Sequence, residues 1–265
     1  MKRSLNILVT NDDGVESPGL VALARALFEA GHRITIVAPS RDWSGAGASI
    51  GPIHLNEPIP VTSHVWEEFE GVGVDVYAID RPPATGVWAA CLGAFGEIPD
   101  LIASGINPGA NTGHLTLHSG TVGAALTGSA FGVPGIALSL EWATAGEYQW
   151  ETAARFAPAA AEWAMEASGE LMPAVLNVNV PNRLFADVLG VREAQLARYG
   201  EVWVNNADHS GGDLRLTFEG GGREPDPESD VALIGAGYVA VTPLVGIARG
   251  SLTGAAERVS EALSI

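Results

Sequence analysis

The chain has 265 residues, 47% of them hydrophobic, and a formal net charge of −17. This length and composition predict a globular chain with one sizeable core and exclude an intrinsically disordered one. The acidic balance argues against a nucleic-acid or membrane partner, because both need a basic surface. It leaves open a small phosphorylated substrate held through a cation. No apolar run reaches the length of a membrane span and no signal peptide is expected, so we expect a cytoplasmic protein.

Short apolar segments alternate with helical patterns through the first two thirds of the chain. Strands are expected at about 5–10, 34–38, 74–79, 101–104 and 135–139, and helices near 18–30, 82–95, 119–131 and 147–168. This alternation predicts an α/β fold of three layers, in which a Rossmann-like, mostly parallel sheet carries helices on both faces.

The pattern changes after about residue 174. Residues 175–181 predict one more strand, strand-like composition follows at 201–204, 213–218 and 231–242, and a short last helix is expected at about 253–263. We therefore expect a single domain over residues 1–265. Its core spans about 1–180, and a β-rich extension with a C-terminal helix spans about 181–265.

Two adjacent aspartates, Asp12 and Asp13, follow the first predicted strand, and Gly14 then lets the chain turn towards a helix that begins at Pro18. Carboxylates at the end of a parallel strand lie in the crevice where open α/β sheets bind ligands. Because adjacent like charges repel, a hard divalent cation is the natural group to lie between them. The alternative is a pair of solvated turn residues that help to start the helix.

Three further polar segments follow a predicted strand or open a predicted helix. They are Ala38-Pro39-Ser40-Arg41-Asp42-Trp43-Ser44-Gly45, Ser104-Gly105-Ile106-Asn107-Pro108-Gly109-Ala110-Asn111-Thr112-Gly113 and Ser119-Gly120-Thr121. Together with Asn11-Asp12-Asp13-Gly14, these segments resemble, in order, the motifs of the survival protein E (SurE) family of metal-dependent nucleotide phosphatases. The resemblance is dense over residues 5–50 and 98–141 and thin elsewhere.

The resemblance implies a site for one divalent cation per subunit, Mg²⁺ or Mn²⁺. The implied metal ligands are Asp12, Asp13, Ser44 and Asn107. All four offer oxygen, which suits these ions better than Zn²⁺. Asp12 and Asp13 are also the implied catalytic residues. Asp12 is expected to orient or deprotonate the attacking water, with direct attack on phosphorus as the weaker alternative.

The resemblance further implies a phosphate-binding set. Its members are Gly109, Asn111, Ser119, Gly120 and Thr121. The last three open a predicted helix, where backbone N–H groups, hydroxyls and the helix dipole favour an anion. The alternative for Ser119 is an ordinary helix N-cap.

Four residues beside these motifs depart from the family pattern and are candidates for substrate specificity. They are Trp43, Arg81, His114 and His118. The spacing of the two histidines leaves a zinc site open, but no third nitrogen or sulfur ligand is evident nearby.

The function implied is that of a hydrolase acting on phosphoric monoesters, of the 5′-nucleotidase type, with a nucleoside monophosphate or a related small phosphorylated metabolite as substrate. One alternative is a phosphatase specialised for a non-nucleotide biosynthetic intermediate, and another is a non-catalytic homologue that binds a metal or ligand. A dinucleotide-binding protein is excluded, because no G-x-G-x-x-G follows the first strand. By resemblance, the β-rich extension is expected to make the contacts of a homodimer or homotetramer.

Overall fold

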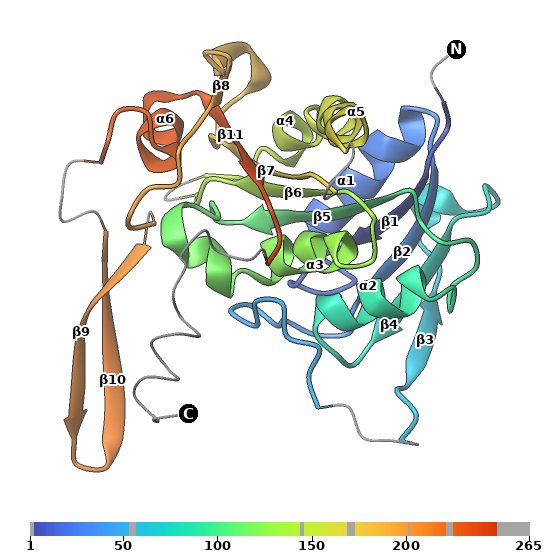
Figure 1. The fold of residues 1–265 in the computed structure, drawn as a ribbon, viewed down its shortest axis with the longest axis horizontal. Coiled ribbons are helices and arrows are strands. Elements are labelled where there is room, and N and C mark those ends of the chain that lie inside the picture. The colour runs from blue at the N-terminus through green and yellow to red at the C-terminus, as the bar shows by residue number, and fades with distance from the viewer. Residues whose placement is uncertain are drawn as a thin grey trace, which may run out of the picture.

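The computed structural model describes residues 3–52, 57–143, 146–168, 173–200, 202–220 and 225–247 (Figure 1). Its main sheet contains β1 (Asn6–Thr10), β2 (Arg33–Pro39), β3 (Val61–His64), β4 (Asp75–Ile79), β5 (Leu101–Pro108), β6 (Gly135–Leu140), β7 (Val175–Val180), β8 (Val191–Glu193) and β11 (Val239–Leu244). The nine strands lie in the order β3-β4-β2-β1-β5-β6-β7-β11-β8. The six strands from β4 to β7 in this order are parallel, whereas β3 and β11 run antiparallel to β4 and β7.

Helices cover both faces of this sheet (Figure 1). One face carries α1 (Pro18–Glu29), α4 (Trp150–Ala154) and α5 (Ala157–Ala167), and the other carries α2 (Pro83–Cys91) and α3 (Gly120–Ser129). The central strands are mostly apolar, as expected of strands whose two faces are both covered by helices. In α1, Leu20, Leu23 and Leu27 recur at helical spacing and are fully buried. The predicted three-layer α/β fold is confirmed.

The helix predicted at 147–168 is two helices, because α4 ends at Ala154 and α5 begins at Ala157. Pro158 explains the break, since a proline clashes with the carbonyl of the residue four positions earlier, here Ala154, and has no N–H to donate. The strands and helices predicted before this helix, up to residue 140, are confirmed, with ends that differ by a few residues. Strands β3 and β8 were not predicted, because both are short.

The strand predicted at 231–242 is wrong in its first half, where Asp230–Ala236 forms α6 and only β11 is extended. The caps explain the helix. The Ser229 hydroxyl accepts a hydrogen bond from the Ala232 N–H, and Gly237 ends the helix at φ 99°. The helix predicted at 253–263 lies outside the described residues.

A separate hairpin of β9 (Val202–Ser210) and β10 (Asp213–Gly220) extends from the body of the molecule (Figure 1). It turns at Gly211 and Gly212, which both have positive φ, as a tight two-residue hairpin loop requires. The main sheet continues past residue 180, since β8 and β11 belong to it. The division into a core and an extension near residue 180 stays a prediction.

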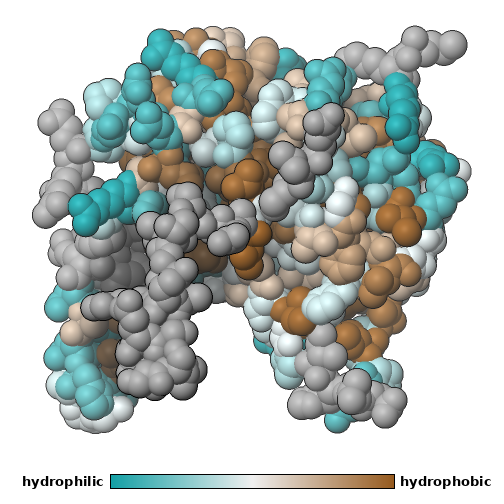
Figure 2. Space-filling view, in the orientation of Figure 1, coloured by the Kyte–Doolittle hydropathy of each residue, from teal (hydrophilic) through white to brown (hydrophobic). Residues whose placement is uncertain are grey.

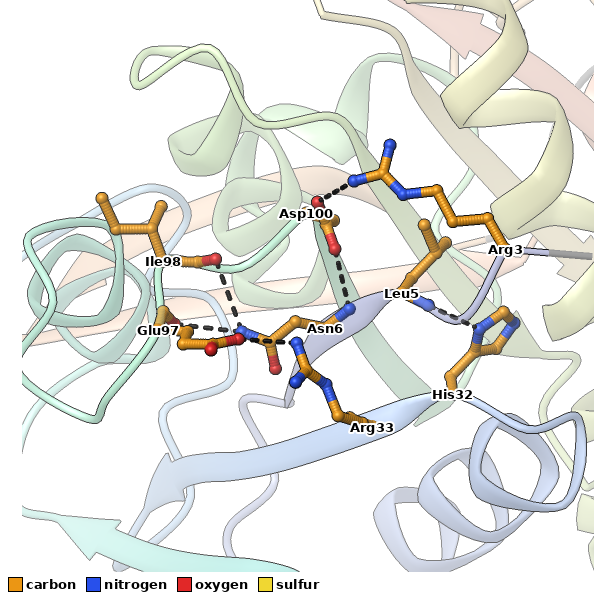
Figure 3. Close-up of polar contacts among 8 residues, drawn as sticks. All are labelled: Arg3, Leu5, Asn6, His32, Arg33, Glu97, Ile98 and Asp100. Atoms are coloured by element: carbon orange, nitrogen blue, oxygen red, sulfur yellow. Dashed lines mark hydrogen bonds and ion pairs between the residues drawn. The ribbon is translucent and has the colours of Figure 1, made fainter.

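Polar contacts fasten the amino end of β1, opposite the end that carries Asp12 and Asp13 (Figure 3). The Asp100 carboxylate accepts hydrogen bonds from Arg3 at 3.0 Å and from the Asn6 N–H at 2.9 Å. Arg33 pairs with Glu97 at 2.6 Å. These contacts align β1, β2 and the segment before β5, although exposed ion pairs of this kind add little to stability.

The face drawn in Figure 2 shows apolar surface distributed among polar surface, with brown patches over the region of α2 and the β3–β4 edge. Among the described residues, no helix has the length and apolar character needed to cross a membrane. The cytoplasmic location expected from the sequence stays a prediction.

Candidate metal and phosphate site

Buried polar atoms without a hydrogen-bond partner gather in or just after the strands of the parallel sheet. Within the described residues they are Thr10 Oγ1, Asp13 Oδ2, Trp43 Nε1, Arg81 Nε, Ser104 Oγ and Asn177 Oδ1. Four of these six lie at or beyond the carboxyl ends of β1, β2 and β4. Leaving a buried polar atom unpaired costs about 1–3 kcal/mol, so such a group of atoms indicates a place where a ligand or water binds.

Asp12 is held between β1 and the start of α3. Its side chain is buried, at 3% exposure, and its carboxylate accepts hydrogen bonds from the Thr121 hydroxyl and the Gly120 N–H. Gly120 has to be glycine, because a Cβ there would lie 2.6 Å from Asp12 Oδ2. Burial raises the pKa of Asp12, and the bonds from Thr121 and Gly120 oppose that rise.

Asp13 is the least satisfied acid of the site. Burial, followed by the charges of Asp12 and Asp42, raises its pKa to about 7. The nearby guanidinium of Arg41 is engaged elsewhere, since it pairs with Asp80 at 3.0 Å and lies 4.1 Å from the centre of the Trp43 ring. A divalent cation fits this environment, because it would supply both the missing charge and a partner for Asp13 Oδ2.

Ser44 is exposed in the loop after β2, where Asp42 fixes it. The Ser44 hydroxyl and N–H donate to the Asp42 carboxylate at 2.6 and 2.7 Å. Because the hydroxyl proton is committed to Asp42, the Ser44 oxygen has lone pairs left for a cation. Asp42 was not among the predicted residues, although an acid two positions before an implied ligand was a signal for it.

Asn107 lies near the end of β5, where the register against β6 shifts between Ser104 and Asn107. Its side-chain Nδ2 donates to the Gly109 carbonyl at 2.7 Å, which leaves Oδ1 as an oxygen ligand. The Gly109 N–H donates to the Leu140 carbonyl at 2.8 Å, so this turn is fastened to the end of β6.

Asn111 is held by two asparagines of β7 that the sequence analysis did not identify. Its carbonyl accepts from Asn177 Nδ2 at 2.8 Å and from Asn179 Nδ2 at 3.0 Å, and its N–H donates to Asn179 Oδ1 at 2.8 Å. Its side-chain amide donates to the Ser139 hydroxyl at 2.9 Å. Asn177 and Asn179 are fully buried. The signal was their alternation in an otherwise apolar strand, which places both on one face.

Ser119 is the N-cap of α3. Its hydroxyl oxygen accepts from the Val122 N–H at 3.1 Å, and its own N–H donates to the Thr116 carbonyl at 3.2 Å. Ser119 therefore caps the helix, which was the alternative role considered for it. Because the Thr121 hydroxyl and the Gly120 N–H are directed at Asp12, much of the predicted phosphate cradle holds that carboxylate. The role of these residues toward phosphate stays a prediction.

The four candidate specificity residues lie in three loops. The backbone N–H of Trp43 donates to the Asp12 carbonyl at 2.8 Å, so the chain at Trp43 lies beside the acidic pair. Arg81 donates from Nη1 to the Asp80 carbonyl at 2.8 Å. His114 and His118 are exposed in the short 3₁₀ helix η2 (Gly113–His118). The zinc alternative gains no support, since the described part of the chain has no group of three or more His, Cys, Asp or Glu side chains suited to a metal ion.

A second buried carboxylate, also not predicted, fastens the segment that carries Asn111 at its other end. Asp230 accepts backbone N–H bonds from Gly113 at 2.7 Å, Ala197 at 3.0 Å and Val231 at 2.9 Å. Burial raises the pKa of Asp230, and these bonds oppose the rise. The segment that carries Asn111 is thus fixed at both ends, by β7 and by α6.

The fold and these groups define a class, namely α/β proteins with an acidic site at the carboxyl edge of a parallel sheet. Within that class, a family model described as survival protein SurE matches residues 7–202, and the chain belongs to the SurE family. It is 37% identical over 243 residues to a protein named 5′-nucleotidase SurE from Gloeobacter violaceus, over 91% of this chain and 89% of the relative.

Two further comparisons agree. A 5′-nucleotidase SurE from Xanthomonas campestris pv. campestris (strain B100) is 35% identical over 248 residues, again over 91% of this chain and 89% of the relative. The crystal structure of SurE protein from Aquifex aeolicus superposes with a TM-score of 0.69 at 29% identity, over 98% of both chains.

Proposed function

We propose that this protein is a divalent-metal-dependent phosphomonoesterase that hydrolyses nucleoside monophosphates. One observation carries the proposal: Asp12 and Asp13 form a buried acidic pair with raised pKa values, and Asp13 Oδ2 has no partner among the described residues. The relatives named 5′-nucleotidase SurE support the choice of substrate.

Asp12, Asp13, Ser44 and Asn107 would hold the cation, one per subunit, with Mg²⁺ or Mn²⁺ as the proposed ion. Their oxygen atoms suit these hard ions. When bound, the ion would neutralise phosphate charge and lower the pKa of a water molecule. Asp12 is proposed to orient that water and accept its proton, as a carboxylate within hydrogen-bond reach of the water can.

Ser119 and Asn111 are proposed to bind the phosphate group. Since the Ser119 oxygen accepts a bond from Val122, its hydroxyl proton is free to be donated to a phosphate oxygen. The Asn111 amide uses one N–H on Ser139, which leaves a second N–H for phosphate. Water then attacks phosphorus, the P–O ester bond breaks, and the alcohol leaves with a proton as inorganic phosphate forms.

A screen of phosphate release tests this proposal. Nucleoside monophosphates, sugar phosphates and a generic aryl phosphate are compared with Mg²⁺, with Mn²⁺ and with a chelator. We expect metal-dependent release that is fastest for a nucleotide. A best substrate without a nucleoside would favour the specialised phosphatase instead, and metal binding without release from any ester would favour the non-catalytic homologue.

We also propose that the protein forms a homodimer or homotetramer through the β9–β10 hairpin. The hairpin extends from the body (Figure 1). Its residues Leu214 and Leu216 are 67% and 48% exposed. An apolar pair on an extended hairpin suits an interface better than solvent. Light scattering on the wild type and on a Leu214→Ser, Leu216→Ser variant tests this, and an unchanged molar mass in the variant contradicts it.

A further inference from the structure

An exposed indole lies at the rim of the proposed site, beside the implied metal ligand Asn107. Trp142 follows β6 and is 57% exposed. A Cβ built on Gly109 would lie 3.4 Å from the Trp142 ring and 3.7 Å from Asn107 Nδ2, so the ring and the amide meet at one glycine. Scattered exposed aromatic residues need no explanation, but one that adjoins a candidate ligand does.

Aromatic neighbours fix the Trp142 ring from behind. Tyr148 meets it edge-on at 6.4 Å and 89°, and Tyr148 itself stacks on Trp150 at 4.7 Å and 22°. Trp150 is in turn packed closely against Gly19 at the start of α1, where a Cβ would lie 3.0 Å from its ring. The indole is thus supported by a row of rings that reaches the core.

Groups of Glu141, directly before Trp142, and of Gln149, further along the chain, are also fastened. The Glu141 N–H donates to the Val180 carbonyl at 2.8 Å, and the Glu141 carboxylate accepts from the Asn182 N–H at 3.0 Å. Asn182 Oδ1 accepts from the Gln149 N–H at 2.9 Å, which holds the far end of the same loop. A ring held in place before binding loses little conformational entropy when a ligand stacks on it.

We propose that Trp142 is a specificity-determining residue whose indole stacks on a planar ring of the leaving group. The site would then favour phosphomonoesters whose alcohol carries a nucleobase or another aromatic ring over esters of aliphatic alcohols. In the site proposed above, Ser119 and Asn111 would bind the phosphate beside the cation at Asn107. The alcohol would then extend towards the rim, where Trp142 offers an exposed face. Stacking on an aromatic side chain accepts any base, because every base has a π-face. This inference rests on the phosphomonoesterase function proposed above.

The test compares AMP with glycerol phosphate in the wild type, Trp142→Ala and Trp142→Phe. We expect the ratio of kcat/KM for AMP over glycerol phosphate to fall about 10-fold in Trp142→Ala, mainly through KM, and to be largely restored in Trp142→Phe, because loss of a stacking side chain has an effect of this order. Trp88→Ala is the matched control, since Trp88 is a part-exposed tryptophan on α2 that packs against Phe131, and it should leave the ratio unchanged.

A binding measurement separates failure of this inference from failure of the proposed function. Saturation-transfer NMR follows adenosine binding to the wild type and to Trp142→Ala without any turnover. An unchanged substrate ratio together with metal-dependent release overturns the role of Trp142 and leaves the function standing. Adenosine binding that depends on Trp142, without phosphate release from any ester, supports stacking on Trp142 and overturns the proposed function. If the wild type neither binds adenosine nor releases phosphate, both the role of Trp142 and the proposed function are overturned. If Trp142→Ala loses kcat/KM equally for AMP and glycerol phosphate and changes its molar mass, Trp142 belongs to an interface between subunits and its role in specificity is overturned.

Discussion

The hydroxyl of Thr121 donates a hydrogen bond to Oδ1 of Asp12, so the first turn of α3 and the end of β1 meet on one carboxylate. Gly120 adds its N–H from the same turn. The positive end of a helix thereby stabilises the ionised form of a buried acid that would otherwise be costly to keep charged. The first turn of α3 therefore fixes the Asp12 carboxylate, a proposed ligand of the cation.

This relationship predicts the behaviour of Thr121→Val, which keeps the shape of the side chain and removes its hydroxyl. The pKa of Asp12 should rise further, because a bond to the ionised form is lost. We expect the Mg²⁺ concentration for half-maximal activity to rise about 10-fold or more, in keeping with about 1.5–3 kcal/mol for a hydrogen bond to a charged group. Thr127→Val is the control, since among the described residues the Thr127 hydroxyl bonds to the Gly123 carbonyl within α3 and not to the site. Equal metal dependence in the two variants contradicts the prediction.

The raised pKa of Asp13 predicts a pH effect on the metal-free protein. Its pKa of about 7 in the folded chain lies above the ordinary value, so ionisation opposes folding, and stability present at low pH is lost as the pH rises towards 7. The Tm in chelator should therefore fall between pH 4 and 7 more steeply in the wild type than in Asp13→Asn. Saturating Mg²⁺ should reverse the loss at pH 7 in the wild type alone. Parallel Tm curves for the two proteins in chelator would falsify this assignment.

The contacts around Asn111 predict coupling between β7 and phosphate binding. Asn179→Ala removes a donor and an acceptor from the backbone of Asn111, and should lower the free energy of unfolding by about 2–4 kcal/mol. It should also weaken inhibition by inorganic phosphate, as should Asn111→Ala. Because both substitutions act on one group, their effects on the inhibition constant should not add in the double variant. Additive effects on the inhibition constant would contradict this coupling, and an unchanged inhibition constant in Asn179→Ala would assign Asn179 to stability alone.

Trp43 and His114 predict changes in substrate ranking. Arg41 covers one face of the Trp43 ring, so only the other face is available to a substrate. Trp43→Ala and His114→Ala should each change kcat/KM unequally across nucleotides, by about 1–3 kcal/mol for the substrates that contact them. Kinetics with purine and pyrimidine monophosphates measure the ranking. An unchanged ranking in both variants, with AMP or GMP still best, assigns these loops to variable surface.

The layers of the fold could be predicted from local patterns. A strand buried on both faces is a short apolar run, and an amphipathic helix has apolar residues at helical spacing. The break before Pro158 was missed, although a proline in a helix interior carries a known penalty and was a signal for it. Helix α6 was missed because its apolar residues suggested a strand, although Ser229 and Gly237 marked its ends.

The acidic pair and its loops were predicted from motifs, but their supports were not. Asn177, Asn179 and Asp230 act on backbone groups more than 30 residues away, and such pairings depend on tertiary packing that no local pattern contains. The same holds for the use of the α3 N-terminus. Sequence reasoning directed the helix N-terminus at phosphate, and that role stays a prediction. What the sequence did not reveal is that the Thr121 hydroxyl and the Gly120 N–H lie against Asp12 in the fold.

The most direct test of the central claim is Mn²⁺ binding and phosphate release from AMP, measured together on the wild type, Asp12→Asn and Asp13→Asn. The exposed Asp187→Asn serves as the matched control. We predict one Mn²⁺ per chain in the wild type and the control, weakened binding in the two site variants, and turnover lower by about 100-fold or more in each, as expected when a charged ligand or the water-positioning group is lost. Near-wild-type turnover of either site variant at saturating metal would contradict the assignment of Asp12 and Asp13 as the catalytic metal site.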